Sequence, residues 1–98
     1  MTINKAAEGQ KLTITLEGRL DTTTSPDLEK ELQSSLSDVT ELVINISGLE
    51  YISSAGLRVL LSAQKIMNKQ GEMSVTGVTE DIMEIFEVTG FSDILNIV

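Results

Sequence analysis

Apolar and polar residues alternate in short stretches of the chain, which predicts β-strands with one buried face. The clearest stretch is residues 11–17, where every second residue is Leu or Ile. Residues 41–46 are almost continuously apolar, as expected of a central strand buried on both faces. Residues 2–5 and 73–76 predict two further strands, and residues 7–10 predict a turn between the first two.

Other stretches place apolar residues three or four positions apart, which predicts amphipathic helices. The first begins with Ser25 as N-cap and Pro26 at the first helical position, and it ends near residues 37–38. The second covers residues 54–70, with Gly71 after it as a C-terminal cap. Both helices therefore have local start or stop signals as well as an apolar face.

A third helix is predicted to follow Thr79 as its cap and to run through Val88, and Ile97 and Val98 are expected to finish on or near the sheet. The order is strand, strand, helix, strand, helix, strand, helix. Such alternation favours an α/β fold, with a mixed sheet of four or five strands, parallel pairs and flanking helices. The chain has 98 residues and no internal repeat or linker, so we expect a single domain over residues 1–98.

The composition excludes several kinds of chemistry. The chain has no cysteine and no histidine. This rules out disulfides and thiolate catalysis, and it removes the commonest general base and the commonest transition-metal ligand. We therefore expect no metal and no other cofactor.

The charge bears on the kind of partner. The formal net charge is −8, which disfavours nucleic acid and anionic membranes and leaves a basic protein surface as a reasonable partner. No apolar run is long enough to span a bilayer, and residues 1–5 lack the features of a signal peptide. The chain is therefore expected to be cytoplasmic.

Four small residues, Ser53, Ser54, Ala55 and Gly56, stand at the predicted start of the second helix. Ser53 suits the N-cap, because its hydroxyl can accept a hydrogen bond from a free amide of the first turn. Ser54 would then lie in that turn, where free N–H groups and the helix dipole would stabilise a phosphoryl group. Ordinary helix capping explains the same residues, and their spacing alone does not decide between the two interpretations.

Other residues are candidates for a binding surface near this helix start. Asp21 either belongs to such a surface or is a turn residue that pairs with nearby backbone N–H groups, and Thr22 can contribute beside it. Arg58 lies one helical turn after Ser54. It can contact an acidic partner, fold back on a phosphoserine or serve as an exposed solubilising charge. We expect Tyr51 to anchor a loop on the sheet.

Four segments, in order along nearly the whole chain, together resemble one protein family. They are Gly18-Arg19-Leu20-Asp21, residues 49–61, Gly71-Glu72-Met73 followed by Val75, and Thr89-Gly90-Phe91. The family is the STAS domain family, and the resemblance is to its free-standing bacterial anti-sigma factor antagonists. It implies a small mixed sheet flanked by helices.

The resemblance also implies a phosphorylation switch. In the family, a partner that is both anti-sigma factor and serine kinase phosphorylates a serine at the start of the second helix. The unphosphorylated antagonist binds that partner and frees the sigma factor, and a serine phosphatase reverses the modification. Matching Gly56-Leu57 to the family pattern Asp-Ser-x-Gly-Leu places Ser54 at the phosphorylated serine. Ser53 stands where aspartate is usual, and it is a rival acceptor.

Three functions remain open. The first is an anti-sigma factor antagonist switched off by phosphorylation at Ser54. The second is a STAS scaffold or sensor subunit that uses the same surface without a phosphorylation cycle. The third, a small carboxylate-dependent hydrolase, lacks a histidine or cysteine as base or nucleophile, so we do not expect an enzyme. The predicted partner-binding residues are Asp21, Thr22, Ser53, Ala55, Gly56 and Arg58.

Overall fold

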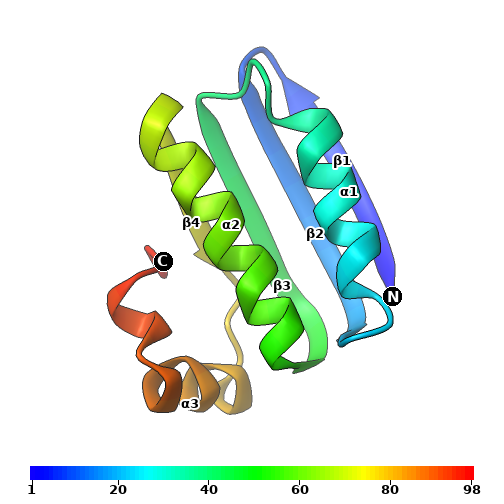
Figure 1. The fold of residues 1–98 in the computed structure, drawn as a ribbon, viewed down its shortest axis with the longest axis vertical. Helices are drawn as coiled ribbons and strands as arrows, with labels where there is room; N and C mark the ends of the chain where they lie inside the picture. The colour runs from blue at the N-terminus through cyan, green and yellow to red at the C-terminus, as the bar shows by residue number, and fades with distance from the viewer.

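The computed structural model describes residues 1–98 and contains one four-stranded sheet in the order β1-β2-β3-β4. The elements are β1 (Thr2–Glu8), β2 (Lys11–Leu20), α1 (Ser25–Ser35), β3 (Glu41–Ile52), α2 (Ser54–Gln70), β4 (Glu72–Thr76), α3 (Glu80–Thr89) and a 3₁₀ turn (Phe91–Asp93). β1 is antiparallel to β2, whereas β2, β3 and β4 are mutually parallel. The predicted α/β class with a mixed sheet is therefore confirmed (Figure 1).

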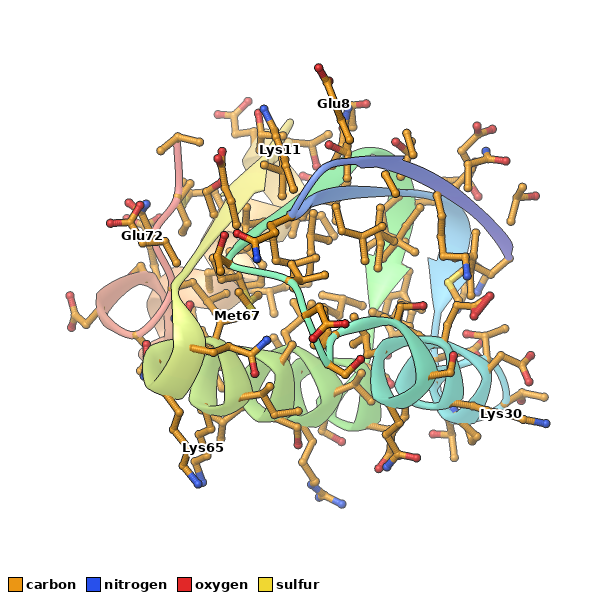
Figure 2. The ribbon with its side chains drawn as sticks, turned by 90° about the horizontal axis from the view of Figure 1, so that it is seen from above. Glu8, Lys11, Lys30, Lys65, Met67 and Glu72 are labelled. Carbon is orange, nitrogen blue, oxygen red and sulfur yellow. The ribbon has the colours of Figure 1, made fainter.

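Helices α1 and α2 lie on one face of the sheet (Figure 2). Each connects two neighbouring parallel strands, and because such crossovers are right-handed, two steps in the same direction put both helices on the same side. The core fills the space between them and the sheet, where Leu42, Ile44 and Ile46 of β3 are fully buried. The prediction that this strand is buried on both faces was wrong, since Val43 and Asn45 on its other face are only half-buried.

The start of α1 differs from the prediction. Thr24 is the N-cap residue and makes no side-chain cap hydrogen bond, while Ser25 is already the first helical residue. Ser25 is buried, and its hydroxyl donates to the carbonyl oxygen of Asp21. This serine therefore ties the helix to the preceding turn instead of capping it. The helix ends at Ser35, short of the predicted residues 37–38.

All four strands are longer than predicted, β3 most of all. β1 continues to Glu8, which pairs with Lys11 across a tight turn at Gly9 and Gln10. β3 continues to Ile52, and its pairing with β2 passes through register shifts. The extension of β3 matters for function, because it carries the chain directly to the first residue of α2.

The residues after β4 form α3 and then return to pair with β4, the edge strand of the sheet. Thr79 caps α3 as predicted, with its hydroxyl accepting a hydrogen bond from the Ile82 amide. Ile97 then forms a single parallel bridge with Val75 of β4, which confirms that the chain finishes on the sheet. None of the helices has both the length and the hydropathy of a membrane span.

Candidate functional site

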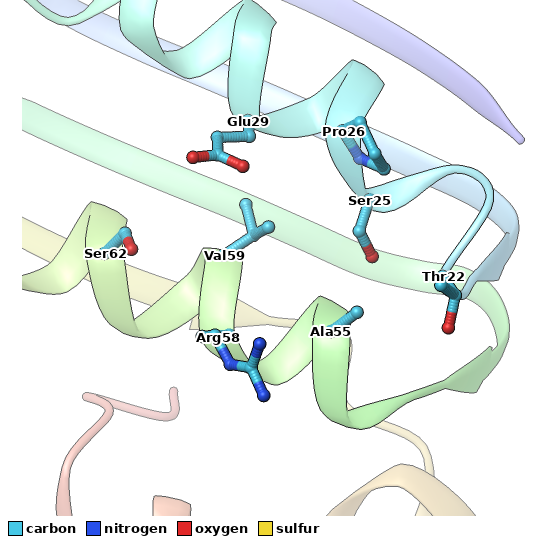
Figure 3. Close-up of a pocket in the computed structure, with 8 residues that line it drawn as sticks. All are labelled: Thr22, Ser25, Pro26, Glu29, Ala55, Arg58, Val59 and Ser62. Carbon is cyan, nitrogen blue, oxygen red and sulfur yellow. The ribbon is translucent and has the colours of Figure 1, made fainter.

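The carboxyl ends of β2 and β3 meet at the N-terminus of α2. The amide of Ser53 donates to the carbonyl oxygen of Leu20 at 2.9 Å, which joins the last residue of β2 to the residue before α2. The turn that follows β2 therefore lies beside the first turn of α2, and Figure 3 shows Thr22 near Ala55 there. Segments about thirty residues apart in the sequence form one surface here.

The start of α2 has the predicted geometry. Ser53 has an extended backbone, and its hydroxyl accepts a hydrogen bond from the Gly56 amide at 3.3 Å, so Ser53 is the N-cap. Ser54 is the first helical residue, its side chain is exposed, and no group of the protein hydrogen-bonds to its hydroxyl. An accessible hydroxyl thus stands beside the free N–H groups of a helix N-terminus.

Gly56 brings this turn close to the sheet. A Cβ atom at this position would lie 2.7 Å from Cγ of Leu20 and 2.9 Å from Cγ1 of Ile52, both of which are buried. Only glycine lets the first turn of α2 pack on the ends of β2 and β3 without displacing these side chains. Because Gly56 is itself buried, we expect it to shape the site without touching a partner.

Asp21 organises the turn between β2 and α1. Its Oδ1 atom accepts hydrogen bonds from the amides of Thr23 at 3.0 Å and Thr24 at 3.1 Å. The pKa of Asp21 is lowered, mainly because its carboxylate accepts the hydrogen bond from the Thr24 amide. Burial raises the pKa and so opposes this effect. The Thr23 amide, the Thr24 hydroxyl and the Arg19 guanidinium lower it further. The turn interpretation of Asp21 is therefore confirmed, and its contact with a partner stays a prediction.

A contact between Arg19 and Tyr51 could not be predicted from the sequence. The Arg19 guanidinium lies over the Tyr51 ring, 4.4 Å from its centroid, and Nε of Arg19 is 3.8 Å from Oδ2 of Asp21. Tyr51 does not anchor a loop as expected: it lies on β3 and its side chain is 39% exposed. Its pairing with Arg19 depends on a register shift in the parallel ladder, for which the sequence carries no local signal.

A shallow groove of about 180 Å³ separates the start of α1 from the start of α2 (Figure 3). It brings together three of the predicted residues, Thr22, Ala55 and Arg58, and the exposed Ser54 immediately precedes Ala55 at the helix start. Sequence reasoning did not assign four of its other lining residues, which are Pro26, Glu29, Val59 and Ser62. The surface is open and small, so it suits contact with another protein better than enclosure of a substrate.

A mixed sheet covered on one face, with a serine displayed at the start of its second helix, is the arrangement that the resemblance to STAS domains implies. The family model described as "Mlab, STAS domain" matches residues 3–97, and the chain belongs to the STAS domain family. The predicted family is thereby confirmed.

Named relatives and solved structures add detail. The anti-sigma-B factor antagonist of Staphylococcus aureus is 27% identical to this chain over 99 residues, which cover 99% of this chain and 92% of that protein. BtrV of Bordetella bronchiseptica is 36% identical over 81 residues, covering 81% of this chain and 70% of that protein. The phosphorylated form of the Bacillus cell fate determinant SpoIIAA has a TM-score of 0.78 at 15% identity, covering 99% of this chain and 91% of that one.

Proposed function

We propose that this chain is an anti-sigma factor antagonist controlled by phosphorylation. It binds a cytoplasmic anti-sigma factor that is also a serine kinase, and in doing so frees the sigma factor. The kinase phosphorylates Ser54, which ends the binding, and a serine phosphatase restores it. The protein acts by binding and is not an enzyme.

The observation that carries this proposal is the exposed Ser54 hydroxyl at the first position of α2. Phosphoryl transfer forms a bond between this oxygen and the γ-phosphorus of ATP, releases ADP and transfers the hydroxyl proton to a base. In a protein kinase reaction, the kinase supplies both the base and the nucleotide. The substrate must therefore offer only an accessible, well-positioned hydroxyl, and Ser54 meets that requirement.

Phosphorylation would change binding more than folding. The phosphoryl group adds about −1.5 to −2 charge, and a helix N-terminus stabilises such a charge by about 0.3–1 kcal/mol. In a close-packed interface, the same dianion must lose its water without a prepared counter-charge, at a cost of several kcal/mol. Each 1.4 kcal/mol corresponds to about tenfold in affinity, so the folded, modified protein would dissociate from its partner.

The named relatives support the proposal. The S. aureus relative is an anti-sigma-B factor antagonist and is matched over 99% of this chain. SpoIIAA, an anti-sigma factor antagonist with the same fold, has been solved in unphosphorylated and phosphorylated forms. A phosphorylated state is therefore compatible with this fold, and the accessible Ser54 offers a site for it here.

Ser53 favours a second candidate function, a scaffold or sensor subunit that binds a partner without a phosphorylation cycle. The family pattern usually has aspartate at this position, where a carboxylate caps the helix and adds negative charge beside the acceptor. In this chain, the Ser53 hydroxyl provides only the cap. A kinase that requires a negative charge beside the acceptor would bind this protein without phosphorylating it.

The deciding experiment first searches the neighbouring genes for a serine kinase of the histidine-kinase-like ATPase type, which is then the candidate kinase. Wild type, Ser53→Ala and Ser54→Ala are incubated with the candidate kinase and ATP. Mass spectrometry then maps the phosphorylated residue. We expect incorporation in wild type and Ser53→Ala and none in Ser54→Ala. Incorporation that persists in Ser54→Ala and vanishes in Ser53→Ala would move the acceptor to Ser53. Binding without incorporation in any variant would favour the scaffold function.

A further inference from the structure

The exposed face of α2 carries a row of cations that begins at the proposed acceptor. Arg58, Lys65 and Lys69 follow Ser54 at offsets of four, eleven and fifteen positions, which places all four residues on one helical face. All are exposed, and Lys65 projects away from the sheet in Figure 2, as Arg58 does in Figure 3. We call Arg58, Lys65 and Lys69 the cationic row; with Ser54 it extends over about 22 Å at 1.5 Å per residue.

No residue of the cationic row forms an ion pair within the protein. The ion pairs of the chain use Lys5, Lys11 and Arg19, and α2 contains no Asp or Glu at all. Every charged side chain that follows Lys69 in the sequence is a carboxylate. In a protein of net charge −8, the cations left free are thus concentrated on this helix.

Helix stability does not explain the whole row. Lys69 lies in the last turn, where a cation interacts favourably with the helix dipole. Arg58 lies near the opposite, positive end, where the dipole disfavours a cation. A glutamate four residues before a lysine would stabilise the helix, and α2 has none. The free cations of α2 are therefore available to an external group.

A depression lined by both polar and apolar side chains lies beside the cationic row. The groove at the helix starts shares Glu29, Val59 and Ser62 with a second hollow further along the same two helices, which reaches Leu32 and Ile66. A continuous depression thus runs between α1 and α2, next to the row. A protein surface with apolar side chains and a rim of carboxylates fits both features.

We propose that the cationic row extends the partner-binding surface and contacts an acidic face of the anti-sigma factor. This inference rests on the proposed function and specifies the charge of the partner surface that the row contacts. An overall charge of −8 repels the phosphates of nucleic acids and anionic lipids at long range, whereas a protein can offer carboxylates at the row alone. A phosphoryl group at Ser54 would then face those carboxylates and be repelled by them.

The test measures the affinity of the candidate kinase for wild type, Lys65→Glu/Lys69→Glu and Lys65→Gln/Lys69→Gln. Lys30→Glu is the matched control, because Lys30 is exposed and free of ion pairs but lies on α1. At about 0.1 M salt, we expect the Glu double variant to bind about tenfold more weakly, the Gln variant to fall between, and Lys30→Glu to change less than about twofold. High salt should reduce these differences in affinity, and it should also reduce the loss of affinity caused by Ser54→Asp.

The other outcomes are distinguishable. If wild type does not bind the kinase, the proposed function fails. If wild type binds and is weakened by Ser54→Asp, but the Lys65 and Lys69 variants match Lys30→Glu, the function stands and this inference is overturned. It is also overturned if the row instead mediates binding to duplex DNA or phosphatidylglycerol vesicles, or self-association in sedimentation, each lost in the Glu double variant.

Discussion

The adjacent serines Ser53 and Ser54 have separate roles set by backbone geometry. Ser53 has the extended conformation of an N-cap, so its hydroxyl is used by the Gly56 amide. Ser54, one residue later, is helical and exposed, and its hydroxyl is free. One side chain stabilises the helix start, while its neighbour remains available for chemistry.

Alanine substitutions should separate these two roles. We expect Ser53→Ala to lower the free energy of unfolding by about 1 kcal/mol through loss of the cap. Ser54→Ala should change it by less than about 0.5 kcal/mol, because it removes no hydrogen bond. Urea unfolding followed by circular dichroism measures both values, and equal losses in the two variants would contradict the assignment of Ser53 as the cap.

Asp21 makes stability depend on pH in a defined direction. Its pKa is lowered in the folded protein, so its carboxylate contributes stability above its ordinary pKa of 3.8, and this contribution is lost as the pH falls through the folded-state pKa. Asp21→Asn should therefore be less stable than wild type at neutral pH, with a gap that narrows below about pH 4. Unfolding series across this range measure the gap, and a constant gap would mean that the carboxylate charge has no part in the turn.

At the scale of elements, a close glycine contact fixes each end of α2. Gly56 lets its first turn pack on β2 and β3, and Gly71 follows its last residue. Gly71 ends the helix as predicted, but not through a left-handed backbone, since its φ of 172° is extended. Glycine is needed because a Cβ atom there would lie 1.9 Å from the carbonyl oxygen of Thr40.

Gly71→Ala should consequently be strongly destabilising. The added methyl group meets backbone at Thr40, which also accepts a hydrogen bond from the Glu72 amide at the start of β4. We expect a loss of about 2–4 kcal/mol in the free energy of unfolding. Gly9→Ala is the control: its φ of 62° is left-handed but its surroundings are open, so it should lose only about 1–2 kcal/mol. A smaller loss for Gly71→Ala than for Gly9→Ala would contradict the close contact.

Elements with local signals could be predicted from the sequence, and features set by strand pairing could not. The residues 54–70 predicted for α2 match its observed bounds, because Ser53 and Gly71 mark its ends in the sequence itself. The extension of β3 to Ile52 depends on hydrogen bonds to β2 across shifted registers. Likewise, the exposed Ser54 follows from a local cap, whereas the Arg19–Tyr51 contact follows only from pairing of distant strands.

At the scale of the whole molecule, charge and structure are arranged around one surface. Helices α1 and α2 cover one face of the sheet, and Lys65 of α2 points outward from that layer (Figure 2). The proposed acceptor stands at the end of this cationic row, where β2, β3 and α2 converge. A charge added at Ser54 would therefore change the character of the whole proposed interface while leaving the core untouched.

The most direct test is calorimetric titration of the kinase with unmodified protein, Ser54-phosphorylated protein, and phosphorylated protein treated with a serine phosphatase. We predict that phosphorylation weakens binding by on the order of a hundredfold or more, that the phosphatase restores it, and that thermal unfolding shows a folded domain in all three samples. Equal affinity of the unmodified and Ser54-phosphorylated proteins would contradict the switch.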